Sequence, residues 1–399
     1  MAVFSSLKIL DFSTLLPGPF ATMMFGDMGA DVIRVEAPTR WDMTRSRPPF
    51  DEGVSAGHSL LSRNKRSFAL DLKKPGAVDI VKKLIQEYDI VLEQFRPGVM
   101  ERLGLGYETL AKENPKLIYC SLTGYGQDGP YRDRAGHDNN YLSIAGVMSH
   151  CGRKGVGPVP QGVQVADIGA GSLHSVIGIL GAVIQRNETG EGQYIDVSMF
   201  DGAMHWNAYA GAHYMASGEI PSYGNMILNG GSQYDYYETS DGRHMSVGSL
   251  EPQFWKGLCE TLGRPDLIER HALPGPEMDA VRDEIAAEFK KKNFEEWSAI
   301  FAEQDCCVEP VLNLEESCEH PQTIAREMVV DVPKPSGNLQ KQIGFPIKFS
   351  KSKPEFKHTG PDMGQHTGEI MLENGFTAEE IADFKERELF GPPKEKGSD

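Results

Sequence analysis

Cysteines at CxxC spacing, long apolar runs and the pattern of a signal peptide at residues 1–8 are not found in this sequence. Its six cysteines are scattered without a CxxC spacing, so neither a zinc site nor a disulfide framework is predicted. No stretch approaches 18 consecutive apolar residues, and residues 1–8 lack the charged region and long apolar region that direct export. We therefore expect a soluble, cytoplasmic protein with reduced thiols and no membrane partner.

Basic residues are also fewer than acidic ones. The chain has 40 lysines and arginines against 57 acidic residues, a formal net charge of -17. A protein with this net negative charge repels nucleic acids and anionic membranes, so neither is expected as a partner. An anionic ligand must then be held by a local basic cluster. A GxGxxG motif after the first predicted strand is missing as well, which disfavours an enzyme that binds a nicotinamide or flavin dinucleotide.

The first half of the chain alternates between short β-branched runs and helical patterns. This order is typical of parallel βαβ units, and it predicts an α/β domain with an open, doubly wound sheet. In such a fold the ligand lies at the carboxyl ends of the strands. The predicted strands cover residues 7–12, 32–36, 67–72, 90–92 and 117–122.

A chain of 399 residues exceeds what one core holds, since single cores stop growing at roughly 250–300 residues. Alternating residues on both sides of Ser240-Asp-Gly242 predict a hairpin that begins a second, smaller α+β domain. We predict a large α/β domain at 1–197, a linker at 198–236, the small domain at 237–325, and a return segment at 326–399 that packs on the large domain.

Two titratable residues stand at predicted helix starts. His137 lies in the motif Arg-Ala-Gly-His-Asp-Asn-Asn-Tyr (134–141), and Asp167 follows the strand-like run 162–166 and precedes a Gly/Ser-rich helix. Helix starts favour negative charge, and two such groups on opposite sides of one carbon can carry out a two-base proton transfer. The same pattern fits a loop histidine and a helix-capping aspartate equally well.

A basic run precedes the strand at 67–72. Arg63, Lys65 and Arg66 fall within four positions, and Arg40 and Arg45 occur in the polar loop before them. Such a cluster can bind a phosphorylated ligand, and it is equally typical of a solvated loop.

Seven motifs in this chain carry a resemblance to a known family. They are Gly-Ala-Asp-Val-Ile-Arg (29–34), Asp-Leu-Lys (71–73), Phe-Arg-Pro-Gly-Val-Met-Glu (95–101), Gly-His-Asp-Asn-Asn-Tyr (136–141), Thr-Gly-Glu-Gly-Gln (189–193), Gly-Ser-Leu-Glu-Pro-Gln-Phe (248–254) and Cys-Val-Glu-Pro-Val-Leu (307–312). In this order they resemble the family III CoA-transferase superfamily (CaiB/BaiF-like), and within it the α-methylacyl-CoA racemases. The resemblance implies a Rossmann-like large domain and an interlocked homodimer, with a heteromer of related subunits as the alternative.

The resemblance also implies an activity. It is the epimerisation of 2-methyl or other 2-substituted acyl-CoA thioesters through an enolate, without metal or redox cofactor and with coenzyme A as part of the substrate. Catalysis is then expected from His137, Asp167 and Glu251, with Glu251 as the partner of His137.

The resemblance also implies contacts to the CoA part of the substrate. They fall on Arg96, Asp138 and Tyr141, with Arg63 and Arg66 near the adenosine phosphates. Where racemases often have an arginine after the second strand, this chain has Ala37, so Arg40 or Arg45 is expected to substitute.

The main alternative is a CoA transferase of the same superfamily. There Asp167 attacks an acyl-CoA and forms a mixed anhydride and then an aspartyl-CoA thioester. The sequence Gly-Gly-Ser-Gln at 230–233 resembles the mobile glycine loop of the transferases. We favour the racemase, because transferases commonly lack the histidine and the Glu251 motif. A catalytically silent subunit of a hetero-oligomer is a third interpretation.

Overall fold

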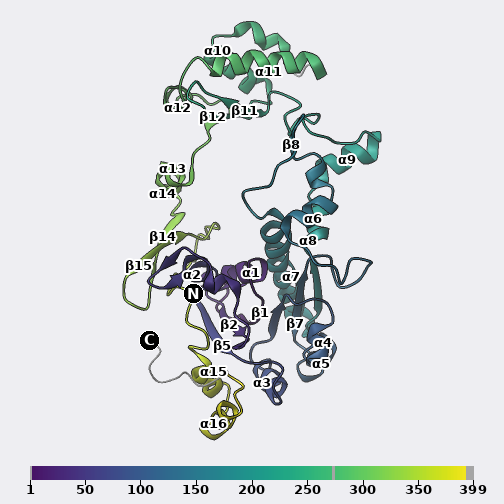
Figure 1. Ribbon diagram of the computed structural model, residues 1–399, viewed down its shortest axis with the longest axis vertical. Coiled ribbons are helices and arrows are strands. Elements are labelled where there is room, and N and C mark those ends of the chain that lie inside the picture. The colour runs from purple at the N-terminus through teal and green to yellow at the C-terminus, as the bar shows by residue number, and fades with distance from the viewer. Residues whose placement is uncertain (1, 272–274, 392–399) are drawn as a thin grey trace. The chain divides into compact units, whose positions relative to one another are not determined.

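The computed structural model describes residues 2–271 and 275–391, and the chain forms two units (Figure 1). Unit 1 comprises Met1–Tyr141, Val163–Ala203 and Ile324–Asp399, and unit 2 comprises Leu142–Gly162 and Met204–Thr323. The sequence pattern places residues 142–162 in the larger domain, whereas in the structure they belong to unit 2. Within unit 2, Arg153 from this segment donates a 2.5 Å hydrogen bond to Asp235.

Unit 1 is built on a six-stranded parallel sheet, which confirms the prediction of a central parallel sheet. Across the sheet the order is β10 (Tyr194–Ser198), β7 (Ile118–Thr123), β6 (Ile90–Glu93), β1 (Lys8–Phe12), β2 (Asp31–Glu36) and β5 (Lys65–Ala69). From β1, the strands follow in chain order toward β5 at one edge and from β6 toward β10 at the other, so the order reverses between β1 and β6. This is the strand order of dinucleotide-binding doubly wound folds, which bind ligands at the reversal point.

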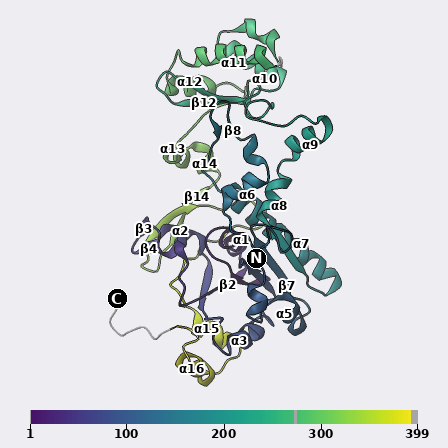
Figure 2. The same ribbon diagram turned by 45° about the vertical axis from the view of Figure 1, so that its right-hand side comes forward.

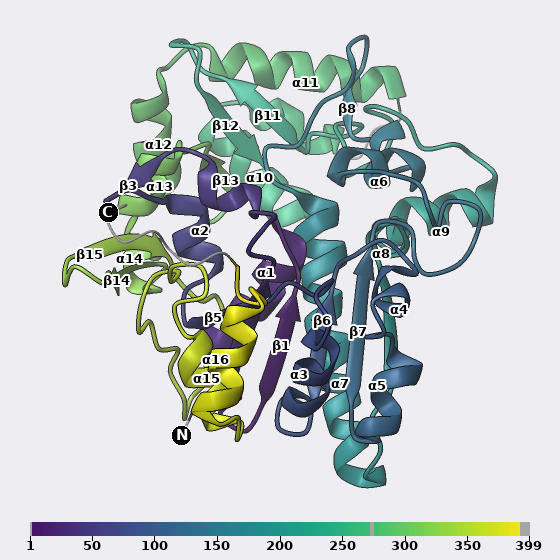
Figure 3. The same cartoon turned by 60° about the horizontal axis from the view of Figure 1, so that its bottom comes forward.

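Helices cover both faces of this sheet. On one face, apolar strand residues such as Leu10 and Val91 pack with Ile80, Leu110 and Ile370 in one buried cluster. The helices of that face are α3 (Ala77–Leu84), α4 (Val99–Arg102), α5 (Tyr107–Glu113), α15 (Thr367–Glu373) and α16 (Ala378–Glu386), several of which lie in front of the strands in Figure 3. The other face carries α1 (Pro17–Asp27) and α7 (His174–Thr189), which contact β1, β7 and β10.

The strand-like run at 162–166 is not a strand, so that prediction is wrong. Val165–Leu173 forms a π-helix, η3, that continues into α7. Its small residues allow close packing: a Cβ at Gly171 would lie 2.9 Å from Met199 Cγ, and one at Gly202 would lie 2.6 Å from Ala170 Cβ. The stretch Val165–Thr189 is long and apolar enough to cross a membrane by length and composition alone; in unit 1 it packs on α1 and β7.

The segments predicted as loops around the basic run contain small elements. The polar loop at 39–60 holds η1 (Met43–Ser46), the hairpin of β3 (Phe50–Asp51) and β4 (Val54–Ser55), and the start of α2 (Ala56–Leu61). The return segment adds a hairpin of β14 (Val329–Pro333) and β15 (Leu339–Ile343). Its side chains then cover the edge strand β5: His366 Nδ1 accepts the N–H of Ser67, and Thr367 Oγ1 accepts that of Ala69, each at 3.1 Å.

Unit 2 contains an antiparallel sheet of β11 (Asp235–Glu238), β12 (His244–Val247) and β13 (Val308–Pro310). The hairpin predicted around Ser240-Asp-Gly242 is present, with Gly242 at a positive φ of 83°. Trp255, Phe289 and Trp297 are buried in one apolar cluster of this unit. The helices of unit 2 lie against its sheet (Figure 2). These helices are α10 (Pro252–Thr261), η4 (Pro265–Arg270), α11 (Gly275–Phe289) and α12 (Phe294–Ala302), preceded by α8 (Met199–His205) and α9 (Ala208–Ser217) and followed by α13 (Leu314–Glu319) and α14 (Pro321–Ala325).

Candidate functional site

The reversal of strand order in unit 1 defines where a ligand is expected. The loops after β1 and β6 meet there, since the N–H of Gly18 donates a 2.9 Å hydrogen bond to Gln94 Oε1. Leu15 has a φ of 63°, a conformation that costs energy for a branched side chain, and such residues cluster at functional sites. Arg96, two residues after Gln94, is exposed. The predicted CoA contact Arg96 therefore lies at the edge that the fold favours for ligands.

Leu15 and Gln94 were not candidates from the sequence. The Leu-Leu-Pro-Gly-Pro turn directly after the first predicted strand is the one signal that points to this loop.

Buried charges support the start of α1. Lys65 Nζ lies 3.1 Å from Asp11 Oδ2 and 2.6 Å from Thr22 Oγ1, and it donates a 2.9 Å hydrogen bond to the carbonyl of Pro19. Burial lowers the pKa of Lys65 to about 8, although the charge of Asp11 opposes this. Ser13, at the end of β1, also bonds to Asp11. Lys65, which is part of the basic run, is therefore a structural residue in unit 1.

His137 stands on a well-anchored turn before α6 (Asp138–Ile144). Its N–H donates a 3.0 Å hydrogen bond to Asn140 Oδ1, and the hydroxyl of Tyr141 donates to the carbonyl of Gly136. The ring of Tyr141 is buried and lies edge-on to Tyr125, with ring centroids 5.1 Å apart. A Cβ at Gly136 would lie 2.6 Å from the Tyr141 ring, so only glycine fits there. The side chain of His137 is exposed on this turn.

Asp167 lies beside this turn. Asp138 Oδ1 accepts the N–H of Ala166 at 2.7 Å and that of Asp167 at 3.0 Å. Burial raises the pKa of Asp167 to about 6; the charge of Asp138 raises it further, and that of His137 lowers it. The structure therefore brings Asp167 together with His137, Asp138 and Tyr141, which belong to an earlier motif of the sequence.

These contacts correct one detail of the sequence interpretation. Asp167 does not cap its own helix, because it lies within η3, whose first residue is Val165. The cap comes from α6, through Asp138. The N–H groups of Ala166 and Asp167 are thus already occupied, and these two do not serve as free donors for an oxyanion.

The predicted arginine contacts divide into two kinds. Arg63 is buried and donates to both oxygens of Asp27, at 2.9 and 2.6 Å, while Arg66 donates to Asp31 at 3.2 and 2.8 Å. Arg66 also binds carboxylates of the return helix α15, Glu369 and Glu373. Contact of either arginine with adenosine phosphates stays a prediction, and it would compete with these bonds.

The two arginines proposed to replace the one missing at Ala37 also differ. Arg45 is bound to both oxygens of Glu36, at 2.9 and 2.6 Å, whereas Arg40 is exposed.

Glu251 belongs to unit 2 and is described within it. It precedes α10, is exposed, and accepts the N–H of Trp255 through its backbone carbonyl at 2.9 Å. Its partnership with His137 stays a prediction. The glycine loop at 230–233 is anchored in the same unit, because Gln233 Nε2 donates to the carbonyl of Ser249 and Ser232 Oγ to that of Ile227, at 2.8 and 2.7 Å.

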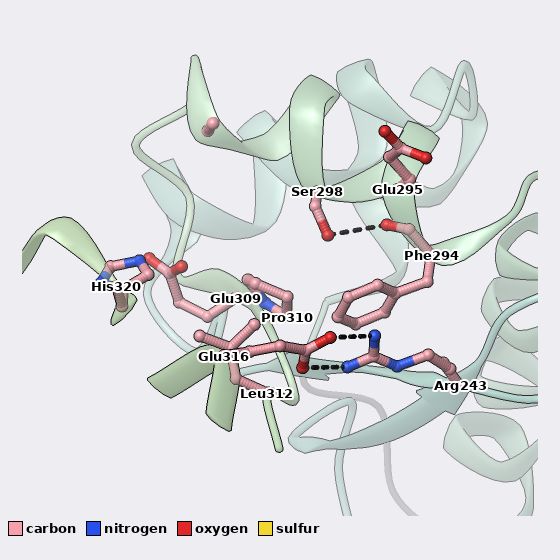
Figure 4. Close-up of a pocket in the computed structure, with 10 residues that line it drawn as sticks. Arg243, Phe294, Glu295, Ser298, Glu309, Pro310, Leu312, Glu316 and His320 are labelled. Carbon is pink, nitrogen blue, oxygen red and sulfur yellow. Dashed lines mark hydrogen bonds and ion pairs between the residues drawn. The ribbon is translucent and has the colours of Figure 1, made fainter. Parts of the chain in front are cut away.

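The described part of unit 2 also contains an open pocket of about 490 Å³ (Figure 4). Arg243 crosses it, bound through two 2.7 Å hydrogen bonds to Glu316 and stacked 3.4 Å from the centroid of Phe294. Of the sequence-predicted site residues, none lines this pocket in the described ranges. Arg243 and Glu316 satisfy each other's charge in this pocket.

Comparisons with known proteins agree with the fold and the motifs. The CoA-transferase family III model matches residues 4–367. A crystal structure of a CAIB/BAIF family protein from Brucella suis superposes with a TM-score of 0.80 at 30% identity, covering 94% of this chain and 99% of the other.

Curated relatives carry two kinds of name. Alpha-methylacyl-CoA racemases from Mus musculus and Homo sapiens are 37% and 36% identical, and the alignments cover 95% and 98% of both chains. The human succinyl-CoA:glutarate CoA-transferase is 31% identical over 92% of this chain and 85% of its own. A family model that spans nearly the whole chain, together with these relatives, shows that the protein is an enzyme of CoA-transferase family III.

Proposed function

We propose that this enzyme is a cofactor-independent racemase or epimerase of 2-methyl or other 2-substituted acyl-CoA thioesters. The observation that carries the proposal is the position of Asp167 beside the His137 turn, with the pKa of its carboxyl raised to about 6 by burial. A general base works best when its pKa lies near the operating pH. The motifs and the two racemase relatives support the same assignment.

The proposed chemistry consists of two proton transfers at the α-carbon. One of the pair His137 and Asp167 removes the α-proton of the thioester, and the C–H electron pair forms an enolate with negative charge on the thioester oxygen. The other residue returns a proton to the opposite face of the same carbon, which inverts it. The two exchange roles for the other enantiomer, so no atom is gained or lost. Glu251 is proposed to orient His137, and Arg96 to bind the CoA part of the substrate.

Isotope exchange tests this proposal directly. Purified protein is incubated with a chiral 2-methylacyl-CoA in deuterated water, without any free carboxylic acid. We expect deuterium at the α-carbon together with loss of optical purity, because both proton transfers occur on the enzyme. Exchange that requires an added acid acceptor would contradict the racemase.

A CoA transferase is the second candidate, favoured by the transferase relatives and by the glycine loop at 230–233. In that reaction Asp167 is a nucleophile, so acyl-CoA alone should leave a covalent adduct on it. Intact mass measurement after mixing with acyl-CoA, and trapping with hydroxylamine, detect the adduct. The racemase predicts an unmodified Asp167.

A further inference from the structure

We propose that Asp138 is a positioning residue that holds Asp167 in place for proton transfer and controls its ionisation, rather than a contact for the CoA part of the substrate. The inference rests on the proposed function, because it assigns Asp167 a task in that reaction. It changes the role that the family resemblance implies for Asp138.

The geometry of one carboxylate oxygen carries the inference. Asp138 Oδ1 accepts two backbone N–H groups, from Ala166 at 2.7 Å and from Asp167 at 3.0 Å. Hydrogen bonds to a charged acceptor are roughly twice as strong as neutral ones. Asp138 is the first residue of α6, directly after His137, so it ties the backbone of Asp167 to the turn that carries His137. A shift of either segment would therefore move both proton carriers.

The packing around Asp167 supports this role. The π-helix that carries Asp167 has wide turns, and such turns occur frequently at functional sites. Ser172 fixes the next turn, because the carbonyl oxygens of Pro17 and Asp167 share its single hydroxyl proton, at 2.6 and 3.1 Å from Oγ. Both carbonyl and N–H of Asp167 are thus held, while its side chain has no hydrogen-bond partner among the described residues.

Three titratable groups of unit 1 face the Asp167 carboxyl: Asp138, His137 and Tyr141. Burial is the main reason for its raised pKa, the charge of Asp138 adds to it, and His137 opposes it. Asp138 therefore acts twice. Its hydrogen bonds orient Asp167, and its charge keeps the proton on Asp167 up to a higher pH. Asparagine at this position retains an acceptor oxygen but removes the charge, so the two effects are separable.

The experiment compares Asp138→Asn, Asp138→Ala and a matched control, Asp133→Asn. Asp133 is an exposed carboxylate of the same loop that pairs with Arg132 at 3.2 Å. The first measurement is the titration of the Asp167 carboxyl by carbon-13 NMR, with the resonance assigned from its loss in Asp167→Asn. The second is the pH profile of α-proton exchange from each enantiomer, and the third is equilibrium binding of CoA.

We expect the Asp167 midpoint to fall from about 6 toward the ordinary 3.8 in Asp138→Asn and to stay unchanged in Asp133→Asn. The low-pH limb of the pH profile of α-proton exchange should shift to lower pH together with this midpoint. In Asp138→Ala the plateau rate should fall roughly tenfold or more, because the two N–H groups lose their acceptor. CoA affinity should stay the same in Asp138→Asn.

Two results would overturn the inference. One is an Asp167 midpoint and exchange profile in Asp138→Asn that match the wild type, and the other is a large loss of CoA affinity with an unchanged midpoint. If the wild type shows no exchange at any pH, the proposed function fails instead. The NMR titration still decides then whether Asp138 controls Asp167, since it needs no substrate.

Discussion

Charged side chains are paired with each other on one side of the sheet in unit 1, and on the other side they are exposed or half-buried. On the side of β2 and β5, Arg63 and Arg66 are bound to carboxylates of their own chain. On the side of β6 and β7, Arg96 and His137 are exposed, and Asp167 is half-buried with a raised pKa. In the sequence, Arg63, Arg66 and Arg96 are all candidates for contacts with CoA.

The difference shows what separates structural charges from functional ones. A buried charge needs a partner because desolvation is costly, so Arg63 and Asp27 are both buried and paired. A group that works on a substrate has to stay available and reach solvent or ligand. The side of β6 and β7 meets this second condition, and it also contains the reversal point of strand order.

The largest expected effects lie on the open side. His137→Ala and Asp167→Asn should each lower the rate of inversion by about a hundredfold to ten-thousandfold, the usual contribution of a positioned acid or base. Neither should lower thermal stability, because His137 is exposed and the Asp167 side chain has no partner to lose within the described residues. Polarimetry and thermal unfolding check this, with the exposed His244→Ala as control. A variant that inverts substrate at the wild-type rate would remove that residue from the reaction.

On the paired side, Arg63→Ala should destabilise the protein without touching the chemistry. It leaves Asp27 buried without its main partner, and breaking such a pair typically costs about 3–5 kcal/mol of unfolding free energy. Denaturant unfolding measures the loss, and Arg40→Ala, which removes an exposed charge, should stay within about 0.5 kcal/mol of the wild type. An Arg63→Ala protein of normal stability but poor CoA binding would reverse the comparison.

Arg96→Ala should do the opposite of Arg63→Ala. A charge-assisted hydrogen bond is worth about 1.5–3 kcal/mol, so CoA affinity should fall roughly tenfold to a hundredfold while stability stays the same. Isothermal titration with CoA measures the affinity, and Lys112→Ala on α5 is a control for an exposed cation. Equal affinity in the two variants would exclude Arg96 from the site.

At neutral pH the smallest effect is that of His58 on the paired side, because it appears only as the pH falls. Burial, followed by the charges of Arg45 and Arg34, lowers the pKa of His58 to about 4 from 6.5. As the pH falls below 6.5, His58 takes up a proton in the unfolded chain but not in the folded protein. The free energy of unfolding should therefore drop by up to about 1.4 kcal/mol per pH unit until about pH 4. His58→Gln should show a shallower slope over that window in denaturant unfolding. Identical slopes would mean that His58 titrates normally when folded.

Much of unit 1 could be predicted because its signals are local. The strands β1, β2, β6 and β7 follow from short β-branched runs, and the hairpin of unit 2 follows from its Ser-Asp-Gly turn. The run at 162–166 misled because a short alternation of valines also suits a helix start, and the small residues after it allow the tight packing of η3. The hairpin of β14 and β15 was not predicted from the sequence, because lysines and prolines obscure the alternation of apolar and polar residues in its strands.

The sequence by itself determined many of the strands and helices of unit 1, the positions of the family motifs and the two residues that we propose as proton carriers. It could not determine which charges are paired, because Arg63 binds Asp27 and Arg66 binds Glu373, partners 36 and 307 residues away. Nor could it place the Asp138 carboxylate on the N–H groups of Ala166 and Asp167. Such contacts exist only once the chain has folded, since burial decides which polar groups must find a partner and which can remain free for a ligand.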